Sequence, residues 1–448
     1  MTKITEYTVS FSLVRNYIVF AFKRYYDEYI VLGQENIPSN YPVIFAPNHI
    51  NAFMDAIAVH SIAPDKIPVI FLARADIFNN KSALKLLNFA KILPAFRMRD
   101  GMENLGKNNA VFDQCVEILG QNDALGIMPE GNQGEQQKLR PLVKGIFRIA
   151  FAAQQKHNFE QAVKIIPVGI DYGDLVKYGK HIIINIGKPI EVSDYMERYA
   201  LNPVTTTNEI REKLSSELNE LSLNLASEKY YECFKIITEL ANAAFVDKLQ
   251  LPDTTVSRFI ARQEIVKKLI LIEKTDPANI DNLDSLCIEY TDLLKRLNLR
   301  NWVFEQDGQT TSDNIFEGIQ LCCTLPFFIL GFLFNFLPFI IPIYIRKHVI
   351  KSQYVGFFSS LQFVIGLVTF PIFYLLQSFL FCELISNTWW ILFVFFFLQY
   401  PSGKFAIKWY SKTMRFLAKI RYRKLVQRKS FDLQKTLSVR EKIIQKIS

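Results

Sequence analysis

The chain has 448 residues, half of them hydrophobic and 38 of them Phe, so it has room for two or three domains and is apolar for a protein without membrane contacts. Its net charge is +9, but residues 401–448 alone hold 14 Lys and Arg against 2 Asp and Glu. A basic stretch beside apolar segments indicates contact with anionic lipid, and the lack of a basic face elsewhere in the sequence argues against a nucleic-acid-binding protein.

The N-terminal segment, residues 1–34, is expected to form an amphipathic helix. Between residues 9 and 32, apolar side chains such as Phe11, Tyr17 and Phe20 alternate with cations such as Arg15. The charges interrupt the apolar pattern too often for a membrane span, and aromatic residues opposite cations suit a helix that lies in the membrane interface. A helix packed on the neighbouring domain fits the same pattern.

Short apolar runs and amphipathic stretches alternate along residues 35–200. This alternation predicts an α/β domain, in which helices connect the strands of a sheet. The expected strands are Val43–Ala46, Val69–Leu72, Ile92–Phe96, Ala124–Met128, Val163–Ile170 and Ile182–Ile186, and the expected helices lie near residues 52–62, 82–90, 103–119 and 141–155.

A histidine and an aspartate follow the first of these strands. The strand stops at Pro47, and His49 lies on the loop behind it. Asn51 is placed to cap a helix that starts at Ala52 and contains Asp55. On one continuous helix the two residues would face different sides, since each step turns by about 100°. With the histidine on the loop, the carboxylate can hold one ring nitrogen and leave the other as a general base, although a structural His–Asp pair is the alternative.

Four sequence blocks around this pair resemble those of the glycerolipid acyltransferase family, which includes glycerol-3-phosphate and lysophosphatidate acyltransferases. The first has five residues between His49 and Asp55, as in the glycerol-3-phosphate branch. The others follow in the family's order: residues 91–97, with Lys91 in place of a leading Gly and Arg97 at the end; Met128-Pro129-Glu130-Gly131 with residues 139–145; and Ile166-Pro167-Val168. The resemblance covers residues 30 to 190, and it implies a mixed sheet flanked by helices that carries out acyl transfer.

The resemblance also assigns roles to single residues. It implies that His49 is the catalytic base and that Asp55 orients its ring. Glu130 and Gly131 belong to the block that binds the acceptor, and Gly131 permits a tight turn there. Asn48 is expected to contact the substrate as well. A plain turn at the end of a strand is the alternative for the Glu-Gly pair.

A phosphate ester as acceptor would need a cation. Arg97 matches the family's substrate-binding arginine, and a guanidinium can hold a phosphate with two hydrogen bonds. Arg99, on the same face of a strand, and Lys144 are further candidates. The sequence shows no nucleotide-binding fingerprint and no paired metal ligands, so no metal and no cofactor are expected. The donor is expected to be an acyl-coenzyme A or acyl-carrier-protein thioester.

Residues 201–318 change to a helical pattern. Ile210, Leu214 and Leu218 recur at four-residue spacing, and similar stretches follow near residues 228–247, 257–273 and 280–298. The sequence predicts a helical region here and indicates no role for it.

Three runs without charge follow, at Leu321–Ile345, Leu361–Cys382 and Leu384–Gly403, and each is long enough for a hydrocarbon layer of about 20 residues. The last two are expected to form a transmembrane hairpin, and the flanking cations place both of its ends in the cytosol. The catalytic domain is expected there too, because activated acyl donors are cytosolic, so an even number of crossings must separate it from the basic cytosolic tail, residues 404–448. The first run, which contains three prolines, is therefore expected to be broken, re-entrant or interfacial within a membrane-associated region of residues 319–403.

Together these patterns predict an integral membrane acyltransferase of phospholipid biosynthesis, with its catalytic domain on the cytosolic side. It is expected to move a fatty acyl group from a thioester to the hydroxyl of glycerol-3-phosphate. A lysophosphatidate or other lysolipid acyltransferase is the alternative enzyme, and a non-catalytic membrane scaffold is the alternative of another class. The expected partners are the acceptor, the acyl thioester and the lipid bilayer, and not nucleic acid.

Overall fold

A computed structural model describes residues 4–39, 42–65, 67–78, 81–95, 105–157, 162–305, 311–351, 354–385 and 388–447. The chain divides into two compact units. One contains Met1–Asn224 together with Gln353–Ser360, and the other contains Leu225–Ser352 together with Leu361–Ser448. The first unit holds the α/β part of the chain, and the second is helical.

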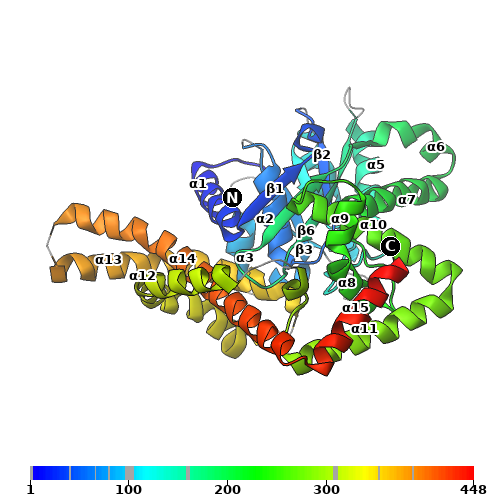
Figure 1. The fold of residues 1–448 in the computed structure, drawn as a ribbon. Helices are drawn as coiled ribbons and strands as arrows, with labels where there is room; N and C mark the ends of the chain where they lie inside the picture. Colours follow the sequence, from blue (N-terminus) through cyan, green and yellow to red (C-terminus); the bar gives the residue numbers. More distant parts are fainter. Residues whose placement is uncertain are drawn as a thin grey trace. The chain divides into compact units, whose positions relative to one another are not determined.

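An eight-stranded sheet forms the centre of the first unit (Figure 1). The strand order is β1-β7-β6-β2-β5-β3-β4, and β8 pairs with β6. Neighbouring strands are parallel, except that β6 runs antiparallel to β7 and β8, so the expected mixed sheet is confirmed. The strands are β1 (Glu28–Leu32), β2 (Val43–Pro47), β3 (Val69–Arg74), β4 (Ile92–Ala95), β5 (Ala124–Gly126), β6 (Lys164–Tyr172), β7 (His181–Ile186) and β8 (Ile190–Glu191).

Helices cover both faces of this sheet. On one face, Ile44 of β2 shares a buried core with Phe147 of α5 and Leu214 of α7. On the other face, the ring of Phe71 on β3 contacts the ring of His60 on α2, with centroids 5.1 Å apart. The helices of this unit are α1 (Val9–Tyr25), α2 (Ala52–Ile62), α3 (Lys81–Phe89), α4 (Leu105–Gly120), α5 (Gly145–His157), α6 (Met196–Leu201) and α7 (Pro203–Leu221), with short 3-10 helices at Gln34–Asn36, Ala75–Phe78 and Val192–Tyr195.

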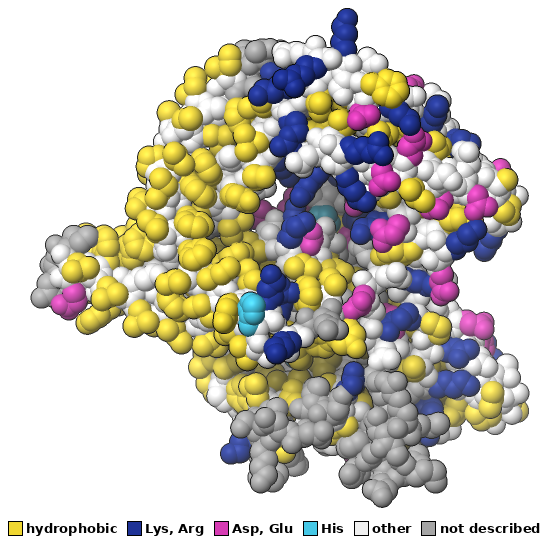
Figure 2. All heavy atoms as spheres, turned by 90° about the horizontal axis from the view of Figure 1, so that it is seen from below, with side chains coloured by type: hydrophobic (Ala, Val, Ile, Leu, Met, Phe, Trp, Pro, Cys, Tyr) yellow, Lys and Arg dark blue, Asp and Glu magenta, His cyan; other side chains and the backbone are white. Residues whose placement is uncertain are grey.

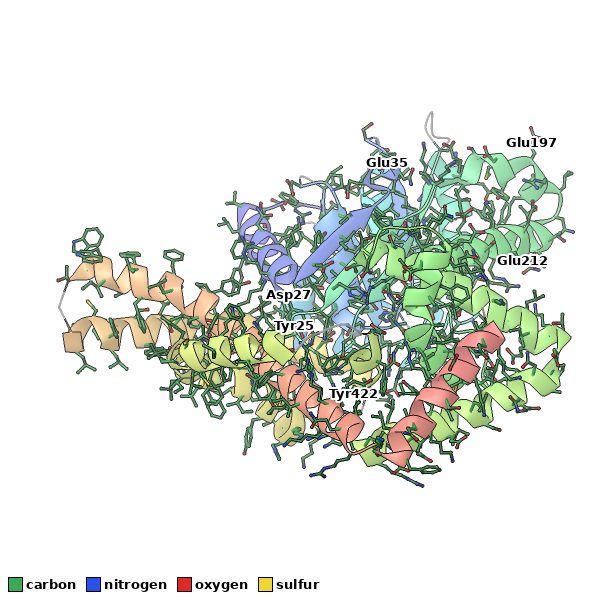
Figure 3. The ribbon with its side chains drawn as sticks, viewed as in Figure 1. Tyr25, Asp27, Glu35, Glu197, Glu212 and Tyr422 are labelled. Carbon is green, nitrogen blue, oxygen red and sulfur yellow. The ribbon has the colours of Figure 1, made fainter. Side chains whose placement is uncertain are left out.

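The N-terminal segment contains a strand as well as a helix. α1 ends at Tyr25, and β1 follows as an edge strand parallel to β7. Two main-chain hydrogen bonds hold the turn between them, from Gly179 N to Tyr25 O (3.1 Å) and from Asp27 N to Lys180 O (2.9 Å); Tyr25 and Asp27 are labelled in Figure 3. The prediction of one helix over residues 1–34 is therefore wrong at Glu28–Leu32, whose β-branched and aromatic side chains favour a strand.

α1 has one buried and one exposed apolar side. The buried side carries Phe11 and Phe22 as well as Arg15, whose guanidinium donates to the main-chain oxygens of His60 (2.8 Å) and Ala63 (2.9 Å) at the end of α2. The other side exposes Val9, Leu13, Tyr17 and Phe20. This exposed stripe fits a helix in the membrane interface, which stays a prediction.

The first long helix after residue 200 belongs to the α/β unit. Ile210, Leu214 and Leu218 of α7 are fully buried in the core that α7 shares with α5 and the sheet. Their spacing predicts the helix correctly, but the domain boundary expected at residue 200 is wrong. The unit extends to Asn224, because the apolar face of α7 is covered by the sheet.

Packed helices form the first part of the second unit. Phe234, Phe259 and Leu283 are buried among them, and so is Ile443 of α15. The expected basic tail is therefore folded. Residues 404–427 continue α14. α15 carries cations on its exposed side and buries its apolar side against α11. The helices are α8 (Tyr231–Leu240), α9 (Asn242–Lys248), α10 (Thr255–Thr275), α11 (Pro277–Leu297) and α15 (Phe431–Ile447), with a 3-10 helix at Asn301–Glu305.

Three helices, α12, α13 and α14, are long and apolar enough to cross a membrane. Figure 2 shows hydrophobic side chains gathered over the α13–α14 end of the molecule, at the left of the view. The expected C-terminal region of apolar helices is thus confirmed. Their bounds are α12 (Thr311–Tyr344), continued by a π-helix at Ile345–Ile350, α13 (Phe358–Ile385), preceded by a 3-10 helix at Val355–Phe357, and α14 (Trp389–Gln427).

α12 runs through its prolines without the expected break. Pro338 and Pro342 lack the N–H that would bond the carbonyl four residues earlier, at Phe334 and Pro338. Side chains of α13 bond these carbonyls instead: Gln377 Nε2 donates to Phe334 O (3.1 Å), and Thr369 Oγ1 donates to Pro338 O (3.2 Å). The helix stays intact because a neighbouring helix satisfies the freed groups. The position of α12 relative to a membrane stays a prediction.

Candidate active site

The candidate active site lies where β2 ends and α2 begins. Asn48 fixes the start of the connecting loop: its side chain donates from Nδ2 to Ile170 O (3.1 Å) and accepts at Oδ1 from Ile170 N (2.7 Å). The side chain thus extends the pairing between β2 and β6 by one residue. A contact between Asn48 and the substrate stays a prediction beside this structural role.

The structure brings His49 and Asp55 together. His49 Nδ1 lies 2.9 Å from Asp55 Oδ2; the histidine side chain is 18% exposed and the aspartate side chain is fully buried. The same Oδ2 accepts the main-chain N–H groups of Ile50 (2.9 Å) and Asn51 (2.8 Å), so it is an acceptor and Nδ1 is the donor. Nε2 then keeps its lone pair, and no described residue bonds to it. A general base needs this arrangement.

Tyr172 holds the aspartate from the other side. Its hydroxyl, at the end of β6, donates to Asp55 Oδ1 (2.6 Å). Burial and, next, the charge of Asp55 raise the pKa of Tyr172 well above its ordinary value, so the hydroxyl keeps its proton and donates. The sequence does not predict this contact, because nothing local links Tyr172 to a residue 117 positions earlier.

Glu130 connects the histidine loop to the loop after β5. Its Oε1 accepts the main-chain N–H of His49 (2.8 Å), and its Oε2 accepts the main-chain N–H (3.2 Å) and Nε (3.0 Å) of Arg140. The pKa of Glu130 lies above its ordinary value, because burial raises it by more than the His49 amide and the Arg140 guanidinium lower it. Both carboxylate oxygens thus position the loops, and Arg140 is a second residue that the sequence does not single out. A contact of Glu130 with the acceptor hydroxyls stays a prediction.

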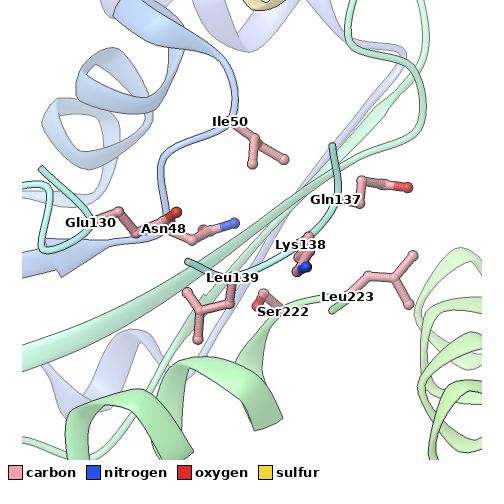
Figure 4. A pocket seen from close by; sticks show the side chains of 8 residues that line it. All are labelled: Asn48, Ile50, Glu130, Gln137, Lys138, Leu139, Ser222 and Leu223. Carbon is pink, nitrogen blue, oxygen red and sulfur yellow. The ribbon is translucent and has the colours of Figure 1, made fainter. Parts of the chain in front are cut away.

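Gly131 forms the turn next to this carboxylate. Its φ is +66°, and a Cβ at this position would lie 2.9 Å from Val143 Cγ1, so a larger residue would be strained. A small hollow opens beside the turn, lined by Asn48 and Glu130 together with residues 137–139 and 222–223 (Figure 4). Asn48 and Glu130, both predicted to bind substrate, therefore border one hollow.

The predicted phosphate-binding cations are described only in part. Arg97 and Arg99 lie outside the described residues. Lys144 is exposed and directly precedes α5. A cavity of about 200 Å³ lies there, bordered by Ala95 at the end of β4 and by Gly145 and Arg148 of α5. In the sequence, Arg97 and Arg99 follow Ala95, and Lys144 precedes Gly145. Both Ala95 and Gly145 line this cavity.

The described residues show no group of three His, Cys, Asp or Glu side chains that could hold a metal ion. The six cysteines are free thiols, with Cys322 and Cys323 exposed on α12. A reaction without metal or cofactor stays a prediction.

Comparison with known proteins shows which family these residues are similar to. Residues 28–171 match the protein family described as Acyltransferase. The chain is similar to two proteins of Saccharomyces cerevisiae: glycerol-3-phosphate O-acyltransferase 1, 25% identical over 48% of this chain and 28% of that protein, and glycerol-3-phosphate O-acyltransferase 2, 22% identical over 65% of this chain and 42% of that protein. The chain thus spans less than half the length of these curated relatives.

Among solved structures, the 1-acyl-sn-glycerophosphate acyltransferase PlsC from Thermotoga maritima is 18% identical, with a TM-score of 0.32 over 46% of this chain and 79% of that chain. The family match covers β1 through most of β6 and includes His49, Asp55 and Glu130. Residues 28–171, within the α/β unit of this chain, are thus similar to the acyltransferase family.

Proposed function

We propose that this protein moves a fatty acyl group from an acyl thioester to the hydroxyl of glycerol-3-phosphate. The observation that carries the proposal is the buried Asp55 carboxylate on Nδ1 of a partly exposed His49. The match of residues 28–171 to the acyltransferase family and the similarity to two yeast glycerol-3-phosphate O-acyltransferases support it.

The proposed reaction is attack of the acceptor hydroxyl on the thioester carbonyl. Nε2 of His49 takes the hydroxyl proton as the new C–O bond forms, and Asp55 stabilises the ring while it carries the extra charge. The C–S bond then breaks, and the leaving thiolate takes a proton back from Nε2. Every atom in these steps comes from the two substrates and the histidine, so the chemistry itself calls for no further group.

The acceptor is proposed to bind with its phosphate on cations and its hydroxyl near the histidine. Arg97 is the first candidate for the phosphate, with Arg99 and Lys144 beside it, because a guanidinium can bind a phosphate with two hydrogen bonds. Glu130, Gly131 and Asn48 are proposed to shape the site around the glycerol part. The hollow that Asn48 and Glu130 border supports this assignment.

The catalytic domain is proposed to lie on the cytosolic side of a membrane. The three long apolar helices and the exposed apolar stripe of α1 support membrane association. Cytosolic acyl thioesters and acceptors would then reach the site directly, and the product would form beside the bilayer that dissolves it.

An acceptor panel tests the proposal. Purified full-length protein receives labelled palmitoyl-coenzyme A with glycerol-3-phosphate, with lysophosphatidate or with no acceptor. Transfer at least tenfold faster to glycerol-3-phosphate is the expected result. Preference for lysophosphatidate would replace the acceptor and keep the chemistry. A folded protein without transfer to any acceptor would instead be a scaffold.

Two variants test the assigned residues. His49→Ala should remove turnover while binding of the acyl donor survives, and equal loss of both would make the histidine structural. Arg97→Ala should raise KM for glycerol-3-phosphate more than KM for the donor. A defect confined to the donor would refute its assignment to the phosphate.

A further inference from the structure

A segment from far along the chain belongs to the α/β unit. Residues 353–360 group with residues 1–224, although more than a hundred residues of the other unit separate them in sequence. The described part, from Tyr354 to Ser360, holds the 3-10 helix Val355–Phe357 and the first turn of α13. The ring of Phe357 packs on the ring of Phe53 in α2, with centroids 6.2 Å apart.

Two serines of this segment bond to the loop that carries His49. Ser359 Oγ donates to Asn51 Oδ1 (2.7 Å), and Ser360 Oγ donates to Asn51 O (3.0 Å). Ser360 Oγ also accepts the main-chain N–H of Met54 (3.3 Å). Asn51 and both serines are at most 2% exposed, so water cannot replace these bonds. Three hydrogen bonds therefore fix one short piece of the loop.

The start of α2 lacks a side-chain cap of its own. Asn51 is predicted to cap α2 with its side chain, but it makes no such bond, and its amide oxygen faces Ser359 instead. Met54 is the third residue of the helix, where a capping side chain commonly accepts the N–H, and here this N–H donates to Asn51 O (2.9 Å). Ser360 Oγ, 306 residues away, is a second acceptor for the same N–H (3.3 Å). The prediction of a side-chain cap at Asn51 is therefore wrong, and Ser360 of α13 contacts both the Asn51 carbonyl and the Met54 N–H at the start of α2.

The backbone at this point is also strained. Ala52 has a φ of +42°, in the left-handed region, which costs a residue other than glycine about 1–2 kcal/mol. Such a conformation persists only where the surrounding contacts impose it. Gly356 helps to bring the segment close, since a Cβ at this position would overlap Gln133 Nε2 and lie 2.8 Å from Ile50 O.

The fixed piece of loop leads directly to the acid–base pair. The main-chain N–H groups of Ile50 and Asn51 both donate to Asp55 Oδ2, the oxygen that holds His49. A shift of Asn51 would move two of the four donors to the carboxylate and turn it away from the ring. The serines therefore act on the reaction through Asn51 and Asp55.

We propose that Ser359 and Ser360 are positioning residues for the His49–Asp55 pair, so that the first turn of α13 completes the active-site loop. This proposal rests on the proposed function of that pair. α13 is also one of the three helices long and apolar enough to cross a membrane. The loop is thus attached to the start of an apolar helix, and anything that displaces this helix start slows the reaction without weakening substrate binding.

The test compares three serines of one helix. Ser359→Ala and Ser360→Ala are combined in one variant, Ser360→Thr keeps the hydroxyl, and Ser378→Ala is the matched control. Ser378 is equally buried in α13, and its Oγ accepts from Gln399 Nε2 (3.0 Å) in the second unit. Initial rates give kcat and both KM values for full-length protein in lipid nanodiscs, and thermal unfolding gives the folded fraction.

The double variant should lose at least tenfold in kcat, with both KM values within twofold of wild type. Ser360→Thr should recover most of kcat, and Ser378→Ala should keep it. Equal kcat in the double variant and the control, at equal folded fraction, overturns the proposal. So does a change confined to KM.

A second readout needs no turnover. Diethyl pyrocarbonate modifies accessible imidazoles, and peptide mass spectrometry follows the rate at His49. A loosened loop in the double variant should raise this rate at least threefold, while the control matches wild type. If wild type transfers no acyl group, the proposed function fails, and the modification rate still decides the positioning role: an unchanged rate in the double variant refutes it.

Discussion

The hydrogen bond from Tyr172 to Asp55 offers a sharp test of the site. Tyr172→Phe keeps the ring and removes only the hydroxyl, the one described donor to Asp55 Oδ1. A hydrogen bond to a charged group contributes about 1.5–3 kcal/mol to stability, so the variant should lose about 2 kcal/mol. For a unit of this size the thermal midpoint should fall by about 4–8 °C.

The reaction should slow as well. Without Tyr172 the carboxylate is held through Oδ2 alone and can rotate, so His49 loses part of its alignment. A loss of about 1.4 kcal/mol of transition-state stabilisation corresponds to a tenfold lower kcat. The KM values should stay unchanged, because Tyr172 is buried behind Asp55 and does not reach the hollow beside Glu130.

Tyr26 provides the matched control. Its ring lies 6.2 Å from that of Tyr172, and its buried hydroxyl has no hydrogen-bond partner among the described residues. Tyr26→Phe should therefore stabilise the protein by about 1 kcal/mol, since it removes an unsatisfied polar group. Both variants are measured by thermal unfolding and by initial rates. Equal behaviour of the two, or a stability loss in Tyr172→Phe at full kcat, would refute the reasoning.

Three further predictions concern the free energy of unfolding, and thermal unfolding in detergent measures each of them. Burial lowers the pKa of His60 to about 3, so the unfolded chain binds a proton that the fold excludes; stability should fall by about 1.4 kcal/mol from pH 7.5 to 5.5, and His60→Leu should remove that loss. Gly131→Ala should cost about 1–2 kcal/mol, whereas Gly106→Ala, with open space around it, should not destabilise. Thr369→Val should cost about 1 kcal/mol because Pro338 O loses its bond to Thr369 Oγ1, and Leu376→Met on the exposed side should cost nothing.

The sheet and the acid–base pair are predictable because their signals are local. Central strands such as β2 are apolar on both faces and appear as continuous runs in the sequence. His49 and Asp55 are six residues apart, so one loop and one helix start determine whether they can meet. The four sequence blocks, taken together in their order, then indicate acyl transfer, whereas no single block does so.

The rest of the site depends on contacts that no local pattern shows. Tyr172, which bonds to Asp55, comes from a strand in the middle of the sheet. Ser360, which bonds to Asn51, lies 309 residues later in the sequence. Asn51 has the right residue type and position for a cap, yet its side chain accepts from Ser359, and the next residue, Ala52, has a positive φ. Local propensity predicts a helix start here, and tertiary contacts decide how it is capped.

The contacts of Ser359 and Ser360 also lead to a prediction of the membrane topology of the chain. They hold the start of α13 on the catalytic unit, so we predict that the connection between α12 and α13 lies on the same side of a bilayer as this unit. Between Asn224 and α12 the described residues contain no other helix long and apolar enough to span a membrane, so we predict that both ends of α12 face one compartment. On this prediction α12 lies within a single leaflet, while α13 and α14 form a transmembrane hairpin. Cysteines introduced at Ile315 and Val349, with Cys322 and Cys323 replaced, should then both react with an impermeant maleimide added to one side of sealed vesicles.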